Sequence, residues 1–122
     1  MQLVLIVEDD PGIQDVLRFL AEANQMRVVT ANTCEVAMRV AESNRPDIAV
    51  VDLGLPDRDG IQLIRHMRTW SRAPIIVLSA RTLEAHRLAA FAAGADDYVT
   101  KPFSAPDLLA RMRALLSRQP PT

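Results

Sequence analysis

The chain has 122 residues, of which 49% are hydrophobic and 24% charged, as expected for a single globular domain. Its formal net charge of −1 argues against direct nucleic-acid binding by this segment, because nucleic-acid phosphates require a basic surface. The single cysteine, Cys34, cannot form an internal disulfide, and no apolar run approaches the roughly 18 residues of a membrane span. We therefore expect a cytoplasmic protein without a membrane segment, in which Cys34 is an ordinary helix residue.

Short apolar runs alternate with amphipathic patterns five times along the chain. Runs such as LVLIV, IAVV and IIVL are continuous, which is typical of strands in a parallel sheet that helices cover on both faces. The predicted strands are residues 3–7, 26–30, 48–52, 74–79 and 97–100. Each is followed by a segment with apolar residues at helical spacing, so the sequence predicts five β-α units.

Capping residues mark several of the predicted helix ends. Asp10 precedes Pro11, which places a side-chain acceptor before a helix and a proline at its first position. Ser104 stands three residues before Asp107, the spacing of a capping box. Gly94 is expected to end the helix before it. The apolar pattern of that helix consists of Leu88, Ala89, Phe91 and Ala92.

Five β-α units with short, right-handed crossovers predict a doubly wound α/β domain of flavodoxin type. This (βα)5 fold is a three-layer sandwich whose parallel sheet has the strand order 2-1-3-4-5. We expect the domain to cover residues 1–118. Residues 119–122, with the sequence QPPT, look like the start of a linker because two prolines follow the last apolar pattern.

Four of the five predicted strands end in groups suited to metal or phosphate chemistry. Glu8 and Asp9 follow the first strand, Asp52 ends the third, Ser79 ends the fourth and Lys101 follows the fifth. Because the carboxyl ends of parallel strands lie at one edge of the sheet, these side chains are expected to meet. A carboxylate cluster with one hydroxyl and one ammonium group indicates a phosphoryl-transfer site that can hold a divalent cation.

The carboxylates fit the requirements of Mg²⁺, which prefers oxygen ligands and keeps several waters. Asp9 and Asp52 would bridge the ion from neighbouring strands, Glu8 could hold a metal-bound water, and the Gly54 carbonyl could be a further ligand. Carboxylates this close repel one another, and a cation relieves the repulsion. Taken alone, Glu8 and Asp9 could also be an acidic turn, and helix capping is the preferred interpretation of Asp10.

Asp52 is the candidate nucleophile, since a carboxylate can accept a phosphoryl group and form an acyl phosphate. The transition state spreads negative charge over the phosphoryl oxygens, so catalysis depends on positioning and on cationic groups. Lys101 could pair with one of these oxygens and Ser79 could donate a hydrogen bond to another. Without its neighbours, Lys101 would be interpreted as a solvated surface lysine.

Four motifs occur in order along the chain: LIVEDD, DLGLPDRDG, VLSA and GADDYVTKPF. Together they resemble the receiver domain of bacterial response regulators in two-component signalling, and the likeness extends to about Arg118. The second and fourth motifs are most similar to the branch whose receivers precede a winged-helix DNA-binding domain. Within that branch they resemble regulators of potassium-transport operons.

The resemblance implies a role for each residue of the predicted site. Asp52 becomes the phosphoacceptor, with Mg²⁺ (or Mn²⁺) as cofactor and a sensor histidine kinase as partner. The other implied roles are Glu8 and Asp9 as metal-side acids, Gly54 as carbonyl ligand, Lys101 as phosphate contact, Ser79 as switch hydroxyl and Tyr98 as switch aromatic. A cis Lys101–Pro102 peptide bond is also implied. The domain would be a signalling phosphoacceptor, which assists its own phosphorylation and dephosphorylation, and not an enzyme acting on external substrates.

The resemblance also implies an output surface, formed by the fourth helix, the fifth strand and the fifth helix. Phosphorylation would promote a symmetric homodimer through it, and DNA would be bound only by a C-terminal domain beyond this chain. The expected intermolecular pairs are Arg87 with Asp107, Asp97 with Arg111, and Asp96 with Arg118. The alternative is a solvated surface with local ion pairs, each contributing little.

Three other functions compete with a phosphorylated receiver. A magnesium-dependent phosphohydrolase of the haloacid-dehalogenase type would place a second aspartate where this chain has Gly54. A degenerate receiver used only for docking is disfavoured because all the expected acids, the hydroxyl and the lysine are present. A nucleotide-binding domain is disfavoured because no glycine-rich loop follows the first predicted strand.

Overall fold

The predicted parallel sheet is present, with its five strands in the order β2-β1-β3-β4-β5. We describe residues 1–118 of the computed structural model. The strands are β1 (Leu3–Val7), β2 (Arg27–Ala31), β3 (Ile48–Val51), β4 (Ile75–Ser79) and β5 (Asp97–Thr100). The helices are α1 (Pro11–Ala23), α2 (Cys34–Asn44), α3 (Gly60–Arg68), α4 (Glu84–Ala93) and α5 (Ala105–Ser117). The expected doubly wound α/β fold is therefore confirmed.

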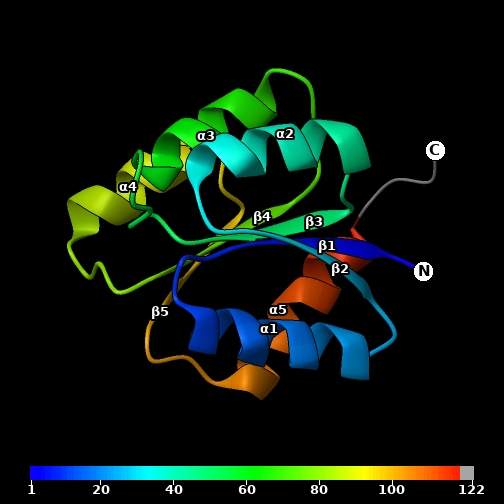
Figure 1. Cartoon of the computed structure of the whole chain (residues 1–122). Coiled ribbons are helices and arrows are strands. Elements are labelled where there is room, and N and C mark those ends of the chain that lie inside the picture. Colours follow the sequence, from blue (N-terminus) through cyan, green and yellow to red (C-terminus); the bar gives the residue numbers. More distant parts are fainter. Residues whose placement is uncertain (119–122) are drawn as a thin grey trace.

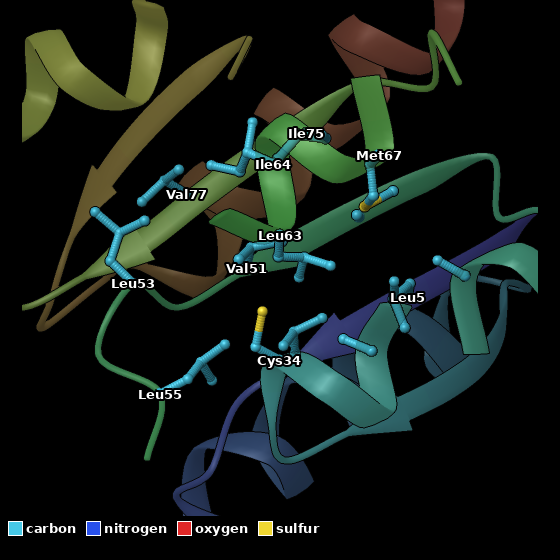
Figure 2. Close-up of a cluster of buried hydrophobic side chains, with 14 of the residues drawn as sticks. Leu5, Cys34, Val51, Leu53, Leu55, Leu63, Ile64, Met67, Ile75 and Val77 are labelled. Carbon is cyan, nitrogen blue, oxygen red and sulfur yellow. The ribbon is translucent and has the colours of Figure 1, made fainter. Parts of the chain in front are cut away.

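Helices cover both faces of the sheet, with α2, α3 and α4 on one face and α1 and α5 on the other (Figure 1). Successive strand residues point to opposite faces, so Leu5 packs in the α2–α3 side of the core (Figure 2) and Ile6 packs on the α1–α5 side. This double coverage explains the continuous apolar runs. No helix within residues 1–118 has the length and apolar character needed to cross a membrane.

Strand boundaries differ from the prediction where the backbone has other partners. The strand expected from Met26 begins one residue later, because the Met26 N–H donates to the Ala21 carbonyl at 3.0 Å in the turn that closes α1. The strand expected from Pro74 begins at Ile75, since proline has no N–H to donate. Asp52 lies immediately after β3 and is not its last residue.

The predicted caps of α1 and α5 are both present, but the second is only half of a capping box. Asp10 Oδ1 accepts hydrogen bonds from the Gly12 and Ile13 N–H groups at 2.8 and 3.2 Å. Ser104 Oγ accepts from the Asp107 N–H at 3.3 Å. The Asp107 carboxylate, however, pairs with the Arg111 guanidinium at 2.9 Å, so the reciprocal bond of a capping box does not form.

Helix α4 ends at Gly94 as predicted, but its buried face differs from the predicted apolar pattern. Ala90 is the buried residue of this helix, whereas the Leu88 side chain is 58% exposed. The small Ala90 allows α4 to approach α3 and β5 closely, and this orientation turns Leu88 to solvent. Cys34, at the first position of α2, is buried and is an ordinary helix residue as expected.

Replacing Gly94 by alanine tests the turn that joins α4 to β5. Gly94 has a φ of 121°, and a Cβ atom there would lie 2.6 Å from Arg68 Cγ. We expect Gly94→Ala to lower the free energy of unfolding by about 1–3 kcal/mol, because the residue would be strained and Arg68 would be displaced. Urea denaturation with an unchanged m-value would measure the loss.

Gly12→Ala is the matched control for this substitution. Gly12 lies in the first turn of α1, and its added Cβ would lie 3.3 Å from Asp10 Oδ1. Alanine is favoured there by helix propensity, so we expect little loss. Equal destabilisation by the two substitutions would contradict a special role for the Gly94 conformation.

Candidate functional site

The acidic residues predicted to meet do so at the carboxyl ends of β1 and β3. These strands are neighbours, and the Asp52 N–H donates to the Val7 carbonyl at 2.9 Å. One carboxylate oxygen each from Glu8, Asp9 and Asp52 lies within 4.8 Å of the others. The topology of the sheet thus brings together acids that are more than 40 residues apart in sequence.

Glu8 is the most buried member of the cluster, with 1% of its surface exposed. Burial raises the pKa of its carboxyl group; hydrogen bonds from Lys101 and Asp10 oppose this shift, and the negative charge of Asp52 adds to it. The Lys101 ammonium lies 2.6 Å from Oε1, and the Asp10 N–H donates to Oε2 at 3.1 Å. Because both oxygens already have partners, Glu8 is better suited to contact a metal-bound water than the ion itself.

Lys101 supplies the positive charge nearest to the carboxylates. Its Nζ lies 3.4 Å from Asp52 Oδ2 as well as 2.6 Å from Glu8. Burial works to lower the pKa of Lys101, but the hydrogen bond to Glu8 and the charges of Asp52 and Glu8 outweigh it and raise the pKa. The Lys101–Pro102 peptide bond is cis. The raised pKa keeps Lys101 protonated, and its two Nζ contacts show that the ammonium group faces the carboxylate cluster.

The donor set fits a hard divalent cation. Three carboxylates converge, while Lys101 neutralises only one of their charges. Gly54 lies beside this cluster, and its N–H donates to Asp52 Oδ1 at 3.2 Å. A Cβ atom at Gly54 would lie 3.9 Å from both Asp52 oxygens, so a side chain at this position would be in contact with the acidic group. Asp9, which is exposed, and Asp52 could hold Mg²⁺ directly.

Ser79 and Tyr98, the predicted switch residues, both form hydrogen bonds with the backbone of Arg81. Ser79, the last residue of β4, is 1% exposed, and its Oγ accepts from the Arg81 N–H at 3.1 Å. The half-buried Tyr98 donates its hydroxyl hydrogen to the Arg81 carbonyl at 2.8 Å. A displacement of the Arg81 backbone would therefore affect both side chains.

Arg81 is a part of the site that sequence reasoning missed. Its guanidinium donates to Asp59 at 2.8 Å and to the Leu53 carbonyl at 3.3 Å. These contacts join the loop after β4 to the loop that follows Asp52. No local sequence pattern predicts these contacts, because Asp59 and Leu53 are 22 and 28 residues away from Arg81 in sequence. From the sequence alone, Arg81 and Asp59 would each be interpreted as solvated surface residues.

Five of the six charged residues predicted to pair across a dimer have partners within one chain; Arg118 forms no ion pair with the other described residues. Arg111 contacts both carboxylate oxygens of Asp97 at 2.9 Å, so a pair expected between two copies is formed here within one. The ion pairs of the remaining residues are Arg111 with Asp107, Arg68 with Asp96, and Arg87 with Glu84. Within the single chain these five residues therefore form local ion pairs, which is the alternative considered for this surface.

Comparison with known proteins agrees with this geometry. The family called response regulator receiver domain matches residues 4–113. The KDP operon transcriptional regulatory protein KdpE of Escherichia coli K12 is 48% identical over 122 residues, which are 100% of this chain and 54% of that protein. KdpE of Mycobacterium tuberculosis H37Rv is 47% identical over 118 residues, 97% of this chain and 52% of its own length. The chain thus spans about half the length of these relatives.

Solved structures show the same likeness in three dimensions. The BeF3-activated receiver domain of Klebsiella pneumoniae RstA has a TM-score of 0.90 and 31% identity, covering 96% of this chain and 99% of that one. The receiver domain of sensor histidine kinase PA1611 from Pseudomonas aeruginosa PAO1, solved with magnesium in its active site cleft, has a TM-score of 0.87 and 33% identity, covering 95% and 98%. The predicted family is confirmed: this chain belongs to the response regulator receiver domains.

Proposed function

We propose that this domain is switched on when a sensor histidine kinase transfers a phosphoryl group to Asp52. The arrangement of the carboxylates carries this assignment. Glu8 is 1% exposed and is held by Lys101 at 2.6 Å, whereas Asp52 is 8% exposed and its contacts with the Gly54 N–H and with Lys101, at 3.2 and 3.4 Å, are longer. Asp52 is therefore the acid that combines access to a donor with a cationic neighbour. Family membership supports the kinase as partner.

In the proposed transfer, an Asp52 oxygen bonds to phosphorus as the phosphorus–nitrogen bond of the kinase phosphohistidine breaks. Asp9, Asp52 and the Gly54 carbonyl would hold Mg²⁺, with Glu8 contacting one of its waters, and the ion when bound neutralises charge on the phosphoryl oxygens. Lys101 pairs with a phosphoryl oxygen and the Ser79 hydroxyl donates to another. A phosphohydrolase of the haloacid-dehalogenase type would have a second aspartate, the general acid, at the position of Gly54. The glycine therefore argues against turnover of external substrates. Hydrolysis of the acyl phosphate, assisted by the same groups, would reset the domain.

The switch would begin with Ser79 exchanging partners. Its Oγ accepts from the Arg81 N–H, and a phosphoryl group on Asp52 would draw the Ser79 hydroxyl away from this contact. Movement of the Arg81 backbone would also break the hydrogen bond from Tyr98 and release that ring to turn inward. The phosphoryl group would thereby bias a two-state surface made of α4, β5 and α5.

The proposed output is dimerisation through the α4-β5-α5 surface and control of transcription. The similarity to two KdpE proteins, each about twice as long as this chain, supports a winged-helix DNA-binding domain after residues 119–122 and a potassium-transport operon as target. The linker predicted at residues 119–122 lies outside the described residues. A cytoplasmic location is part of the same proposal.

Magnesium is expected to stabilise the fold, because a ligand that binds only the native state adds to its stability. At 100 times its Kd, free Mg²⁺ would add about 2.7 kcal/mol to the free energy of unfolding. Asp9→Asn should reduce this gain by removing a carboxylate from the cluster. Urea unfolding with and without Mg²⁺ at constant ionic strength measures the difference. Asp10→Asn, which keeps a capping side chain, should retain the full gain, and an undiminished gain in Asp9→Asn would count against the site.

Acetyl phosphate with Mg²⁺ is expected to add one phosphoryl group to the wild-type chain, as measured by intact-mass spectrometry. Asp52→Asn should remain unmodified, because the amide cannot form an acyl phosphate. Asp15→Asn, which removes an exposed carboxylate from α1, is the control and should be labelled like the wild type. Equal labelling of Asp52→Asn would overturn the assignment, and many turnovers on a phosphomonoester would point to a phosphohydrolase.

A phosphoryl mimic such as beryllofluoride is expected to convert the monomer into a symmetric dimer, measured by light scattering over a range of concentrations. Arg87→Glu should weaken the dimer at least tenfold, about 1.4 kcal/mol, because a two-fold axis uses the Arg87–Asp107 contact twice. Adding Asp107→Arg should restore it. Glu84→Gln removes only the negative charge that pairs with Arg87 within the chain and should leave the dimer intact. A chain that stays monomeric with the mimic would contradict this output.

A further inference from the structure

Asp57 joins the loop after β3 to the start of α2. Its Oδ1 accepts from the Cys34 N–H at 2.9 Å and its Oδ2 accepts from the Glu35 N–H at 3.0 Å. Oδ1 also accepts from the Arg58 N–H at 3.0 Å within the loop itself. The hydrogen bonds from Cys34 and Glu35 lower the pKa of the Asp57 carboxyl group, although the group faces solvent. An exposed aspartate thus makes contacts with two helix amides that are 23 and 22 residues away in sequence.

The amides that Asp57 binds have no acceptor inside their own helix. The first N–H groups of a helix lack carbonyl partners, and side chains commonly satisfy them. The side chain of Thr33, the N-cap residue of α2, accepts from the Val36 N–H at 3.1 Å and so leaves the Cys34 and Glu35 N–H groups to another acceptor. Asp57 therefore completes the cap of α2 from another loop, and its negative charge is favourable at a helix N-terminus.

The loop that Asp57 holds is the one that carries Gly54. Leu53 and Leu55, on either side of Gly54, are buried in the same core cluster as Cys34 (Figure 2). Gly54 forms a bridge with Asp59, which Arg81 binds from the other side. The loop is thus held on one side by Asp57 and α2, and on the other by Arg81. Burial of Leu53 and Leu55 anchors the loop to the core, while the contacts of Asp57 and Arg81 hold it in place along the surface.

We propose that Asp57 is a positioning residue for the cation site, holding the loop so that the Gly54 carbonyl faces the carboxylate cluster. The inference rests on the proposed function, in which Gly54 is a metal ligand. Asp57 itself takes no part in binding the ion, because both of its oxygens are engaged by backbone N–H groups. Removal of its carboxylate would free one side of the loop without changing any of the acids that meet at the site.

The test is the affinity of Asp57→Ala for Mg²⁺, followed by nuclear magnetic resonance through the Gly54 amide signal during a titration with MgCl₂. We expect the Kd to rise about tenfold, near the lower end of what loss of an outer partner costs a metal site. Thr33→Ala is the matched control, since it removes the other capping contact of α2 but leaves the loop tethered. It should lower the thermal midpoint and leave the Kd unchanged.

Asp57→Asn serves as a second variant with a smaller perturbation. Its single carbonyl oxygen can accept one of the two helix amides, so we expect a Kd between those of the wild type and Asp57→Ala. A wild-type Kd in either folded Asp57 variant would overturn the inference, as would an equal loss in Thr33→Ala, which would trace the effect to α2 stability. Failure of the wild-type chain to bind Mg²⁺ would instead refute the proposed function itself.

Discussion

The ion pair between Glu8 and Lys101 is the interaction on which the rest of the site depends. It connects residues that follow β1 and β5, 93 positions apart, at 2.6 Å and in a setting where both side chains are largely buried. Removing one partner of such a pair leaves an uncompensated buried charge, which is strongly destabilising. Lys101 therefore stabilises the acidic residues, in addition to its proposed contact with a phosphoryl group. One ammonium cannot neutralise three carboxylates, and the remaining negative charge favours a cation.

The same fold combines strands that are buried along their whole length with a helix that has few buried contacts. Strands β1, β3 and β4 are buried along their whole length, so the acids and Ser79 are attached to the most stable part of the molecule. Helix α4 is held much less firmly: the side chain of its N-cap residue, Leu83, makes no capping hydrogen bond, and Ala90 is its one buried residue. Switching elements are drawn from regions of low local stability. The contacts of Arg81 with Ser79 and Tyr98 lie between these two regions.

Sequence patterns predicted the sheet and the acidic cluster because both follow from local rules and one topological rule. Buried strands have continuous apolar runs, and the carboxyl ends of parallel strands share one edge, so Glu8, Asp9 and Asp52 could be placed together. The contacts of Arg81 and Asp57 could not be predicted, because each joins two loops and depends on exact backbone positions. The apolar pattern predicted for α4 did not identify its buried face, for a related reason. Whether a leucine or an alanine of this helix faces inward depends on how closely the helix approaches its neighbours.

The ion pairs found within one chain bear on the proposed dimerisation through α4, β5 and α5. Arg111 already binds Asp97 and Asp107, so a symmetric dimer would exchange these partners for equivalent ones across the interface. Such an exchange between solvent-exposed charges contributes little net free energy but selects the correct partner and register.

The driving force for the dimer must then come from burial of apolar surface. Leu83, the N-cap residue of α4, and Leu88 within α4 are 64% and 58% exposed, and they are the large apolar side chains that this surface leaves in water. Their burial would favour the dimer only when α4 takes the orientation that brings them together. Specificity would therefore reside in the charges, and the dependence on phosphorylation would reside in the position of α4.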